Sequence, residues 1–155
     1  MGDHIEEAAK EAGINALRGG TYLVMEGPQF SSLAESELYR SWGCDVIGMT
    51  NMPEAKLARE AELCYATVAM VTDYDCWHPD HDDVTVDQII KVLLGNADKA
   101  KTLVKHAVPR IGTDAKASEC SCRSSLQYAL ITPPEARAEE MKKKLQAVAG
   151  RVLKD

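Results

Sequence analysis

The sequence predicts an α/β fold in which helices alternate with the strands of a parallel sheet. Two short apolar stretches, at residues 21–25 and 44–49, are each followed by a turn and then a helical pattern. Residues 64–72 form a longer apolar run, which is typical of a strand buried in a parallel sheet. Farther along, residues 86–104 repeat apolar side chains every 3.6 residues, which predicts a long amphipathic helix.

Local signals mark the ends of the predicted elements in the first half of the chain. Ser32 and Glu35 have the spacing of a capping box, and Pro53 lies in the first turn of a helix that follows Asn51. Gly13 is a natural stop for the first helical pattern. The predicted elements here are helices at 3–12, 32–42 and 51–62 and strands at 21–25, 44–49 and 64–72.

The second half of the chain is predicted to be helical. Thr85 and Gln88 form another capping box, and Pro109 with Gly112 is expected to end the long helix. Two more helices are expected, one at 122–131 and one that starts at Thr132-Pro133-Pro134-Glu135 and reaches about Leu153. The expected inward-facing residues are Val86, Ile89, Ile90, Leu93, Leu94, Ala97, Ala100, Leu103 and Val104 on the long helix, Leu126, Ala129 and Leu130 on the next, and Met141, Leu145, Val148 and Val152 on the last.

Length and composition limit the classes of protein to which this chain can belong. A chain of 155 residues is long enough for one domain with a core, so we expect a single domain over residues 1–155. A net charge of -6 and the lack of a basic block argue against a nucleic-acid partner. No apolar run has the length of a membrane span, and the N-terminus is too acidic for a signal peptide. We therefore expect a cytoplasmic protein with no membrane partner.

Five cysteines are scattered along the chain, and this odd count fits reduced thiols. Cys44, Cys64 and Cys76 lie in or beside apolar segments, so they are expected to be small core residues. Cys120 and Cys122 form a Cys-x-Cys pair, which is interpreted below.

Asp73-Tyr74-Asp75 is the candidate ligand-binding stretch. It follows the predicted strand 64–72, and open α/β sheets bind ligands at the carboxyl ends of their strands. If the strand continues, the two aspartates point to the same side and can face one ligand. The alternative is a solvated strand end at which the aspartates only begin a loop, and this stretch alone does not decide between the two.

Histidines and carboxylates in the loop His78-Pro79-Asp80-His81-Asp82-Asp83 raise the possibility of a metal site. No thiolate and no helical pair of histidines supports it, and an acidic exposed loop explains the same residues. We therefore expect no metal ion at this loop.

Four stretches, taken in order, resemble the trimeric nucleoside phosphorylases, and within that family the members that act on methylthioadenosine. The resemblance is specific because four blocks match in the right order, and it covers residues 1 to about 112 well. The stretches are Met25-Glu26-Gly27-Pro28-Gln29-Phe30-Ser31-Ser32, Ala34-Glu35-Ser36, Trp42-Gly43-Cys44-Asp45-Val46-Ile47-Gly48-Met49-Thr50 and Ala69-Met70-Val71-Thr72-Asp73-Tyr74-Asp75-Cys76-Trp77.

The resemblance implies phosphorolysis of a purine nucleoside in purine and methionine salvage, with phosphate as co-substrate and no cofactor. Phosphate attacks the anomeric carbon of methylthioadenosine, and adenine and methylthioribose-1-phosphate are released. In the family, the residue matching Asp73 meets N7 of the base as a general acid. The residue matching Asp75 helps to bind the base; because a carboxylate accepts hydrogen bonds, it favours a 6-amino purine over a 6-oxo purine.

Further substrate-binding residues follow from the same resemblance. Phe30 is similar to the residue that stacks against base and ribose, and Met49 to the residue under the ribose. Taken alone, both would be read as ordinary core residues. The implied catalytic residues are Asp73 and Asp75. The full implied set of substrate-binding residues is Phe30, Ser31, Met49, Thr50, Asp73, Asp75, Val86 and Ile89.

The family's chain is nearly twice as long as this one, and its Gly-rich phosphate loop lies in its N-terminal half. The resemblance therefore implies the C-terminal half of the nucleoside phosphorylase fold, a mixed central sheet flanked by helices. It also implies an N-terminal half chain as partner, in a homo-trimer or a trimer of heterodimers. Two other functions stay open: a broader purine nucleoside phosphorylase acting on adenosine or inosine, and a non-catalytic half-domain that binds purine nucleosides or only assembles.

The Cys120-Ser121-Cys122 stretch is similar to a Cys-x-Cys pair that can be oxidised in family members from heat-loving organisms. The alternative is a pair of reduced thiols, one of them buried, and we favour this interpretation.

Overall fold

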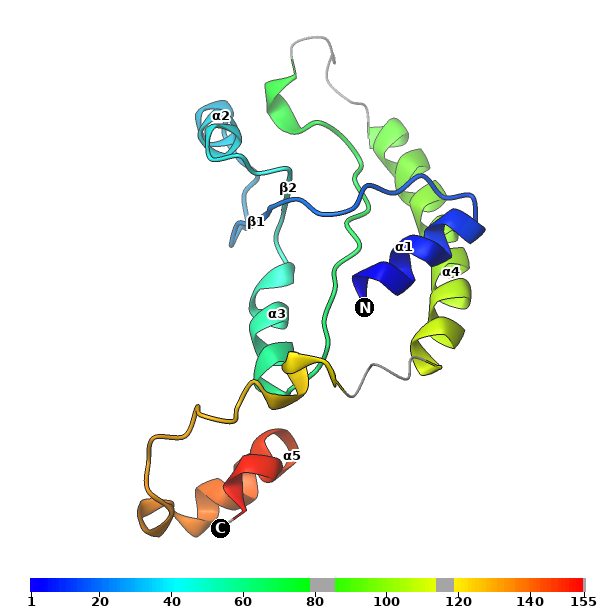
Figure 1. Ribbon diagram of the computed structural model, residues 1–155. Coiled ribbons are helices and arrows are strands. Elements are labelled where there is room, and N and C mark those ends of the chain that lie inside the picture. The colour runs from blue at the N-terminus through cyan, green and yellow to red at the C-terminus, as the bar shows by residue number, and fades with distance from the viewer. Residues whose placement is uncertain (79–85, 114–118, 155) are drawn as a thin grey trace. The chain divides into compact units, whose positions relative to one another are not determined.

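The computed structural model describes residues 1–78, 86–113 and 119–154 (Figure 1). The chain forms two compact units, which are described separately here. Unit 1 comprises Met1–Asn51 with Thr67–Thr113, and unit 2 comprises Met52–Ala66 with Asp114–Asp155. The single domain expected over the whole chain stays a prediction.

A small parallel sheet in unit 1 confirms two of the predicted strands. Strand β1 (Tyr22–Val24) pairs with β2 (Val46–Gly48), and helix α2 (Leu33–Ser41) connects them. The register places Tyr22 opposite Val46 and Val24 opposite Gly48. Before the strands, the Asp45 carboxylate accepts a hydrogen bond from the Thr21 amide over 2.7 Å. The two strands therefore begin and end together, and both carboxyl ends lie at one edge of the sheet.

Within this sheet, Tyr22 crosses over Gly48. A Cβ atom added to Gly48 would collide with the hydroxyl oxygen of Tyr22. Glycine at position 48 thus leaves the space that the tyrosine side chain occupies.

Helices α1 (Gly2–Glu11) and α4 (Val86–Gly112) form the core of unit 1. They lie side by side in Figure 1, and small residues let them approach closely. At the edge of this contact the Arg110 guanidinium binds the Glu11 carboxylate and lowers the pKa of that carboxyl. His106 Nδ1 lies 3.5 Å from the same carboxylate. The buried residues are Ala8 and Ala9 of α1 and Leu103 and Ala107 of α4, with Ile5, Ile14 and Ile111 packed around them.

The inward face predicted for α4 is only partly correct. Leu103 is buried as expected, whereas Leu94 is 63% exposed. Pro109 does not end the helix, which continues to Gly112. The side chains of Val86 and Ile89 lie outside the described part of the chain. The exposed apolar residues of this helix are Ile90, Val92, Leu93, Leu94, Val104 and Val108.

The predicted strand at 64–72 is wrong. Residues 63–74 belong to neither helix nor strand, and Val71 is 59% exposed. Apolar β-branched residues favour extended backbone, but a strand also needs a hydrogen-bonded neighbour. In the described ranges β1 and β2 pair only with each other. One contact from α4 holds this segment, because the Asn96 amide donates to the Val71 carbonyl over 3.0 Å.

In unit 2, helix α3 (Asn51–Glu60, whose first residue belongs to unit 1) ends in a left-handed turn. Glu62 has a φ of +56°, and the Leu63 amide donates back to the Ala58 carbonyl over 2.9 Å. The Glu62 carboxylate accepts two hydrogen bonds from Arg151 of helix α5 (Glu139–Leu153) and one from the Leu126 amide. The Arg151 guanidinium and the Leu126 amide lower the pKa of Glu62 to about 2.

The predicted helix at 122–131 is wrong, and a short 3-10 helix (Ser121–Ser124) takes its place. Serine hydroxyls compete with helical hydrogen bonding, and they do so here. Ser124 donates to the Ser121 carbonyl, and Ser125 donates to the Arg59 carbonyl over 2.7 Å.

The last helix starts later than predicted. Residues Pro134–Ala136 form a 3-10 turn, and α5 begins at Glu139. Its buried residues are Ala149, Gly150 and Leu153, whereas the predicted inward residues Met141 and Val148 are exposed.

The expected core position of Cys76 is also wrong, because its side chain is exposed. Cys44 and Cys64 are half-buried, as are Cys120 and Cys122, and all five cysteines are free thiols. The expectation that one thiol of the Cys-x-Cys pair is buried is therefore not met. Among the described helices, none is both long and apolar enough to cross a membrane.

Candidate functional site

The carboxyl ends of β1 and β2 lead directly into two of the predicted binding segments. The loop after β1 carries Phe30 and Ser31, and β2 is followed at once by Met49 and Thr50. Gly27, with a φ of +75°, brings the first loop close to the second. A Cβ atom on Gly27 would lie only 3.1 Å from the Met49 sulfur, so the Met49 side chain lies against this loop. The structure thus places the Met49 side chain against the loop that carries Phe30 and Ser31.

Ser31 links this loop to the segment that contains the aspartates. Its hydroxyl donates to the Met25 sulfur at 3.6 Å, and its carbonyl accepts from the Cys76 thiol at 3.5 Å. Phe30 is 83% exposed and Thr50 is exposed as well. Both side chains are therefore at the surface of unit 1.

Asp73 and Asp75 lie in a tight turn and not on a continuing strand. Asp75 has a φ of +58° and begins the 3-10 helix Asp75–Trp77. One oxygen of the Asp73 carboxylate accepts from the Asp75 amide at 2.9 Å, and the other accepts from the Thr72 hydroxyl at 2.7 Å. The Asp73 carboxylate thus stabilises the turn through local hydrogen bonds of the kind that Asp commonly makes.

The Asp75 carboxylate contacts helix α2. Ser36 donates its hydroxyl to Asp75 Oδ2 over 2.7 Å, and Ser36 is only 3% exposed. Ser36 is one turn beyond Ser32, whose capping box with Glu35 fixes the start of α2. Sequence reasoning did not single out Ser36 as a site residue. The available signal was a serine in the first turn and a half of the helix that directly follows the Glu26–Ser31 loop.

Aromatic side chains attach the aspartate turn to α2. The Arg40 guanidinium lies 3.5 Å from the centre of the Trp77 ring, a cation–π contact. Tyr74 packs edge-on against Trp77, with ring centres 5.9 Å apart. These contacts position the 3-10 helix, and no sequence motif had marked Arg40 or Trp77 as partners.

The site contains two carboxylates, and they are held by different hydrogen-bond partners. Asp73 is exposed and is held by donors from its own turn, so one of its oxygens can turn to a ligand at the cost of a local hydrogen bond. Asp75 is half-buried and is fixed by a buried hydroxyl. Residues Pro79–Asp83 of the acidic loop, considered above for a metal ion, lie outside the described residues.

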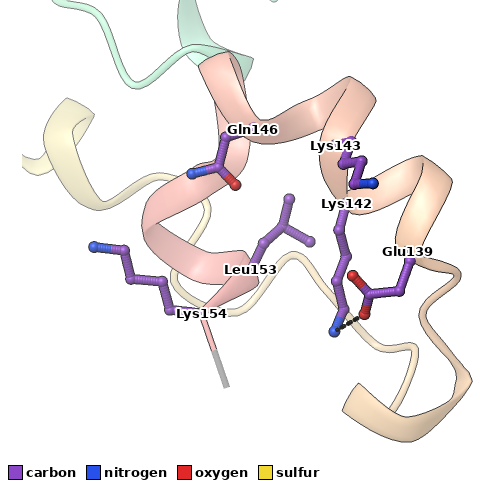
Figure 2. A pocket seen from close by; sticks show the side chains of 6 residues that line it. All are labelled: Glu139, Lys142, Lys143, Gln146, Leu153 and Lys154. Atoms are coloured by element: carbon purple, nitrogen blue, oxygen red, sulfur yellow. Dashed lines mark ion pairs between the residues drawn. The ribbon is translucent and has the colours of Figure 1, made fainter.

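A separate hollow lies in unit 2 beside α5, with a volume of about 410 Å³ (Figure 2). It contains none of the predicted site residues. Lys142 forms an ion pair with Glu139 at 3.0 Å across one wall, as the dashed line in Figure 2 shows. The lining residues are Glu139, Lys142, Lys143, Gln146, Leu153 and Lys154. This is a lysine-rich surface hollow, and the candidate site is the aspartate turn of unit 1.

Known proteins resemble this chain along almost its whole length. The S-methyl-5'-thioadenosine phosphorylase of Rhodospirillum rubrum is 60% identical over 153 residues, which are 99% of this chain and 52% of the relative. A crystal structure of a methylthioadenosine phosphorylase from an antarctic soil metagenomic library matches with a TM-score of 0.83 and 45% identity, covering 94% of this chain and 51% of that one. The Schistosoma mansoni methylthioadenosine phosphorylase in complex with adenine matches with a TM-score of 0.71 and 28% identity, covering 82% of this chain and 50% of that one.

This chain spans about half the length of the curated relatives it matches. The family model described as "Phosphorylase superfamily" matches residues 1–109, the part that holds the sheet, the aspartate turn and most of α4. The structural matches place the chain in the nucleoside phosphorylase fold, of which it forms an α/β half. The chain belongs to the phosphorylase superfamily.

Proposed function

We propose that this chain is the C-terminal half of an S-methyl-5'-thioadenosine phosphorylase, and that it binds the purine and the ribose. The observation that carries this proposal is the 60% identity with the Rhodospirillum rubrum enzyme over 99% of the chain. The reaction is phosphorolysis of methylthioadenosine to adenine and methylthioribose-1-phosphate, a pentosyl transfer. Phosphate is the co-substrate, and no cofactor takes part.

Asp73 is the proposed general acid. The purine leaves with excess electron density, which a proton or a strong hydrogen bond at N7 relieves. The turn holds the Asp73 carboxylate through the Thr72 hydroxyl and the Asp75 amide, and the side chain is exposed to a ligand. These contacts give the carboxyl group a defined position from which it can meet N7.

Asp75 is the proposed acceptor for the 6-amino group of adenine. Its Oδ2 already accepts from Ser36, and a carboxylate has further lone pairs for a second donor. Phe30, Ser31, Met49 and Thr50, at the carboxyl ends of β1 and β2, are proposed to contact base and ribose. Val86 and Ile89, at the start of α4, complete the proposed set.

The proposed partner is an N-terminal half chain of the same enzyme, which supplies the phosphate site. Two features support this partner: the chain spans about half of its relatives, and apolar side chains of unit 1 lie at the surface. Exposed apolar patches of this kind mark sites of association. The exposed apolar residues in question are Val68, Met70 and Val71 in the segment before the aspartates and Ile90, Leu93 and Leu94 on α4.

The remaining parts of the proposal are supported by the sequence resemblance alone. They are a homo-trimer or a trimer of heterodimers, a role in purine and methionine salvage, and a location in the cytoplasm.

Co-production tests this function. The chain is expressed with the part of the Rhodospirillum rubrum enzyme that it does not cover, and adenine release from methylthioadenosine is measured with and without phosphate. We expect phosphate-dependent release by the complex and none by either half alone. Equal kcat/KM for methylthioadenosine, adenosine and inosine would instead indicate a broader nucleoside phosphorylase. A stable complex that binds adenine without turnover at any phosphate concentration would contradict an enzymatic role.

A further inference from the structure

Three cysteines of unit 2 meet at one place, and none of the proposed phosphorolysis residues belongs to this unit. Cys64 follows the end of α3, and Cys120 and Cys122 flank the start of the 3-10 helix Ser121–Ser124. Their three sulfur atoms all lie within 4.8 Å of one another, and the sulfurs of Cys64 and Cys120 are 3.3 Å apart. All three side chains are half-buried. Within the described ranges, no other group of three His, Cys, Asp or Glu residues is arranged to hold a metal ion.

Backbone and side-chain contacts hold the two cysteine-bearing segments together. The Leu126 amide donates to the Glu62 carboxylate at 3.1 Å, and the Ser125 hydroxyl donates to the Arg59 carbonyl at 2.7 Å. The Arg123 amide donates to the Cys120 carbonyl at 3.1 Å, which bends the Cys-x-Cys stretch so that both thiols face the same side. The fold of unit 2 therefore holds the two cysteine-bearing segments together.

The spacing of the sulfurs matches a thiolate metal centre. In a tetrahedral zinc site each Zn–S bond is about 2.3 Å, which puts neighbouring sulfurs a little under about 4 Å apart. The 3.3 Å between the Cys64 and Cys120 sulfurs is a little shorter than this spacing, and all three sulfurs lie within 4.8 Å, so small side-chain shifts are enough to place them around an ion. A disulfide would need two of the sulfurs to approach to about 2.05 Å. Soft thiolate ligands select zinc and other thiophilic metals over magnesium or calcium.

We infer that Cys64, Cys120 and Cys122 bind a Zn²⁺ ion. Each thiol releases its proton to solvent as its sulfur forms a bond to the metal, so three protons leave and the site carries one net negative charge. A water molecule fills the fourth position. The ion fastens residues 119–126 to the end of α3. This role is independent of the proposed phosphorolysis, which uses residues of unit 1.

Metal content and cobalt spectroscopy test this site. The chain, alone or with its co-produced partner, is kept reduced, stripped with a chelator, reloaded with Zn²⁺ and analysed by plasma mass spectrometry. We expect one zinc ion per chain. Replacement of zinc by Co²⁺ is expected to give the intense near-ultraviolet absorption of thiolate-to-cobalt charge transfer.

Single substitutions identify the ligands. Cys64→Ser, Cys120→Ser and Cys122→Ser should each weaken zinc affinity, measured by competition with a chromogenic chelator, by more than about 100-fold. That exceeds the ~10–100-fold loss caused by partners outside the ligand shell. Cys44→Ser in unit 1 is the matched control and should leave the affinity unchanged.

Three results would overturn the site. The first is a reduced wild-type chain that takes up no zinc and shows no cobalt charge-transfer band, a test that does not depend on whether the variants fold. The second is equal zinc affinity in all four variants. The third is a disulfide within the cluster, found by mass spectrometry of chain purified without reductant, together with no zinc uptake after reduction.

Discussion

The buried hydroxyl of Ser36 on helix α2 donates a 2.7 Å hydrogen bond to the carboxylate of Asp75. The two residues come from segments far apart in the sequence, and the bond fixes which oxygen of Asp75 is left to accept from a ligand. Ser36 is therefore a positioning residue for base recognition in the proposed enzyme.

Ser36→Ala should reduce kcat/KM for methylthioadenosine by about 10- to 100-fold in the assembled enzyme, because a hydrogen bond to a charged group is lost. Steady-state kinetics of adenine release measures this. Ser41→Ala on the same helix is the control, since its hydroxyl donates to the Leu38 carbonyl of its own helix. Ser36→Thr keeps the hydroxyl and should restore part of the activity. A loss in Ser36→Ala that the threonine variant does not recover at all would mean that packing, and not the hydroxyl, matters.

Asp75→Asn should shift the substrate preference from 6-amino toward 6-oxo nucleosides. The amide keeps the shape of the carboxylate but adds a donor that suits O6. The measurement is the ratio of kcat/KM for methylthioadenosine to that for methylthioinosine, in wild type and variant. An unchanged ratio would contradict the role assigned to Asp75, even if total activity falls.

Asp73→Ala should lower kcat by ~10²–10⁴, the usual contribution of general acid–base catalysis, with a smaller change in substrate binding. A nucleoside methylated at N7 already has a good leaving group and needs no acid. For 7-methylated substrates the difference between wild type and variant should therefore largely disappear. If the variant is equally impaired on both kinds of substrate, Asp73 positions the turn and is not the acid.

Local signals in the sequence predicted the elements of this fold that local contacts stabilise. Ser32 and Glu35 form the expected capping box, and β1 and β2 lie where the short apolar stretches placed them. The strand predicted at 64–72 was wrong because composition favours extended backbone but does not supply the paired neighbour that a strand needs, and the described residues provide none there. The prediction of a helix at 122–131 was wrong because the hydroxyls of Ser124 and Ser125 donate hydrogen bonds to backbone carbonyls.

The candidate site was predicted from matched motifs, and the contacts between its residues were not. The partnership of Asp75 with Ser36 depends on α2 lying against the aspartate turn, and nothing in the spacing of the two residues shows it. The sharp turn at Asp75 was not predicted either, because the sequence left open whether the strand continues or the aspartates begin a loop.

Glu62 should make the stability of the chain sensitive to acid. Its pKa is lowered to about 2 in the folded chain, mainly by Arg151, from an ordinary value near 4.3. The stabilising contribution is therefore complete above about pH 4.3 and is lost as the pH falls toward 2. Thermal unfolding followed by circular dichroism should show Glu62→Gln as less stable than wild type at neutral pH.

The difference between Glu62→Gln and wild type should shrink as the pH falls below about 4.3. Glu60→Gln, at the last residue of α3 and two residues before Glu62, is the control. A gap in melting temperature that stays constant down to about pH 3 would show that the variant acts through packing and not through the charge of Glu62.

Leu94→Glu should abolish association with the N-terminal half while leaving the fold of the chain intact. Leu94 is 63% exposed here, so a charge costs little in the separate chain but would be buried unpaired in the complex. Co-purification of tagged halves measures association. Lys99→Glu introduces the same side chain on another side of α4 and should not interfere. Normal co-purification of Leu94→Glu would place the partner elsewhere.

The crossing of Tyr22 over Gly48 limits how this scaffold can be engineered. A library that changes the loops after β1 and β2 to alter substrate choice can vary those loops independently of this pair. It cannot vary position 48 alone, because any side chain there meets the Tyr22 hydroxyl. A larger residue at position 48 fits only if position 22 carries a smaller residue than tyrosine. The two codons should therefore be randomised jointly.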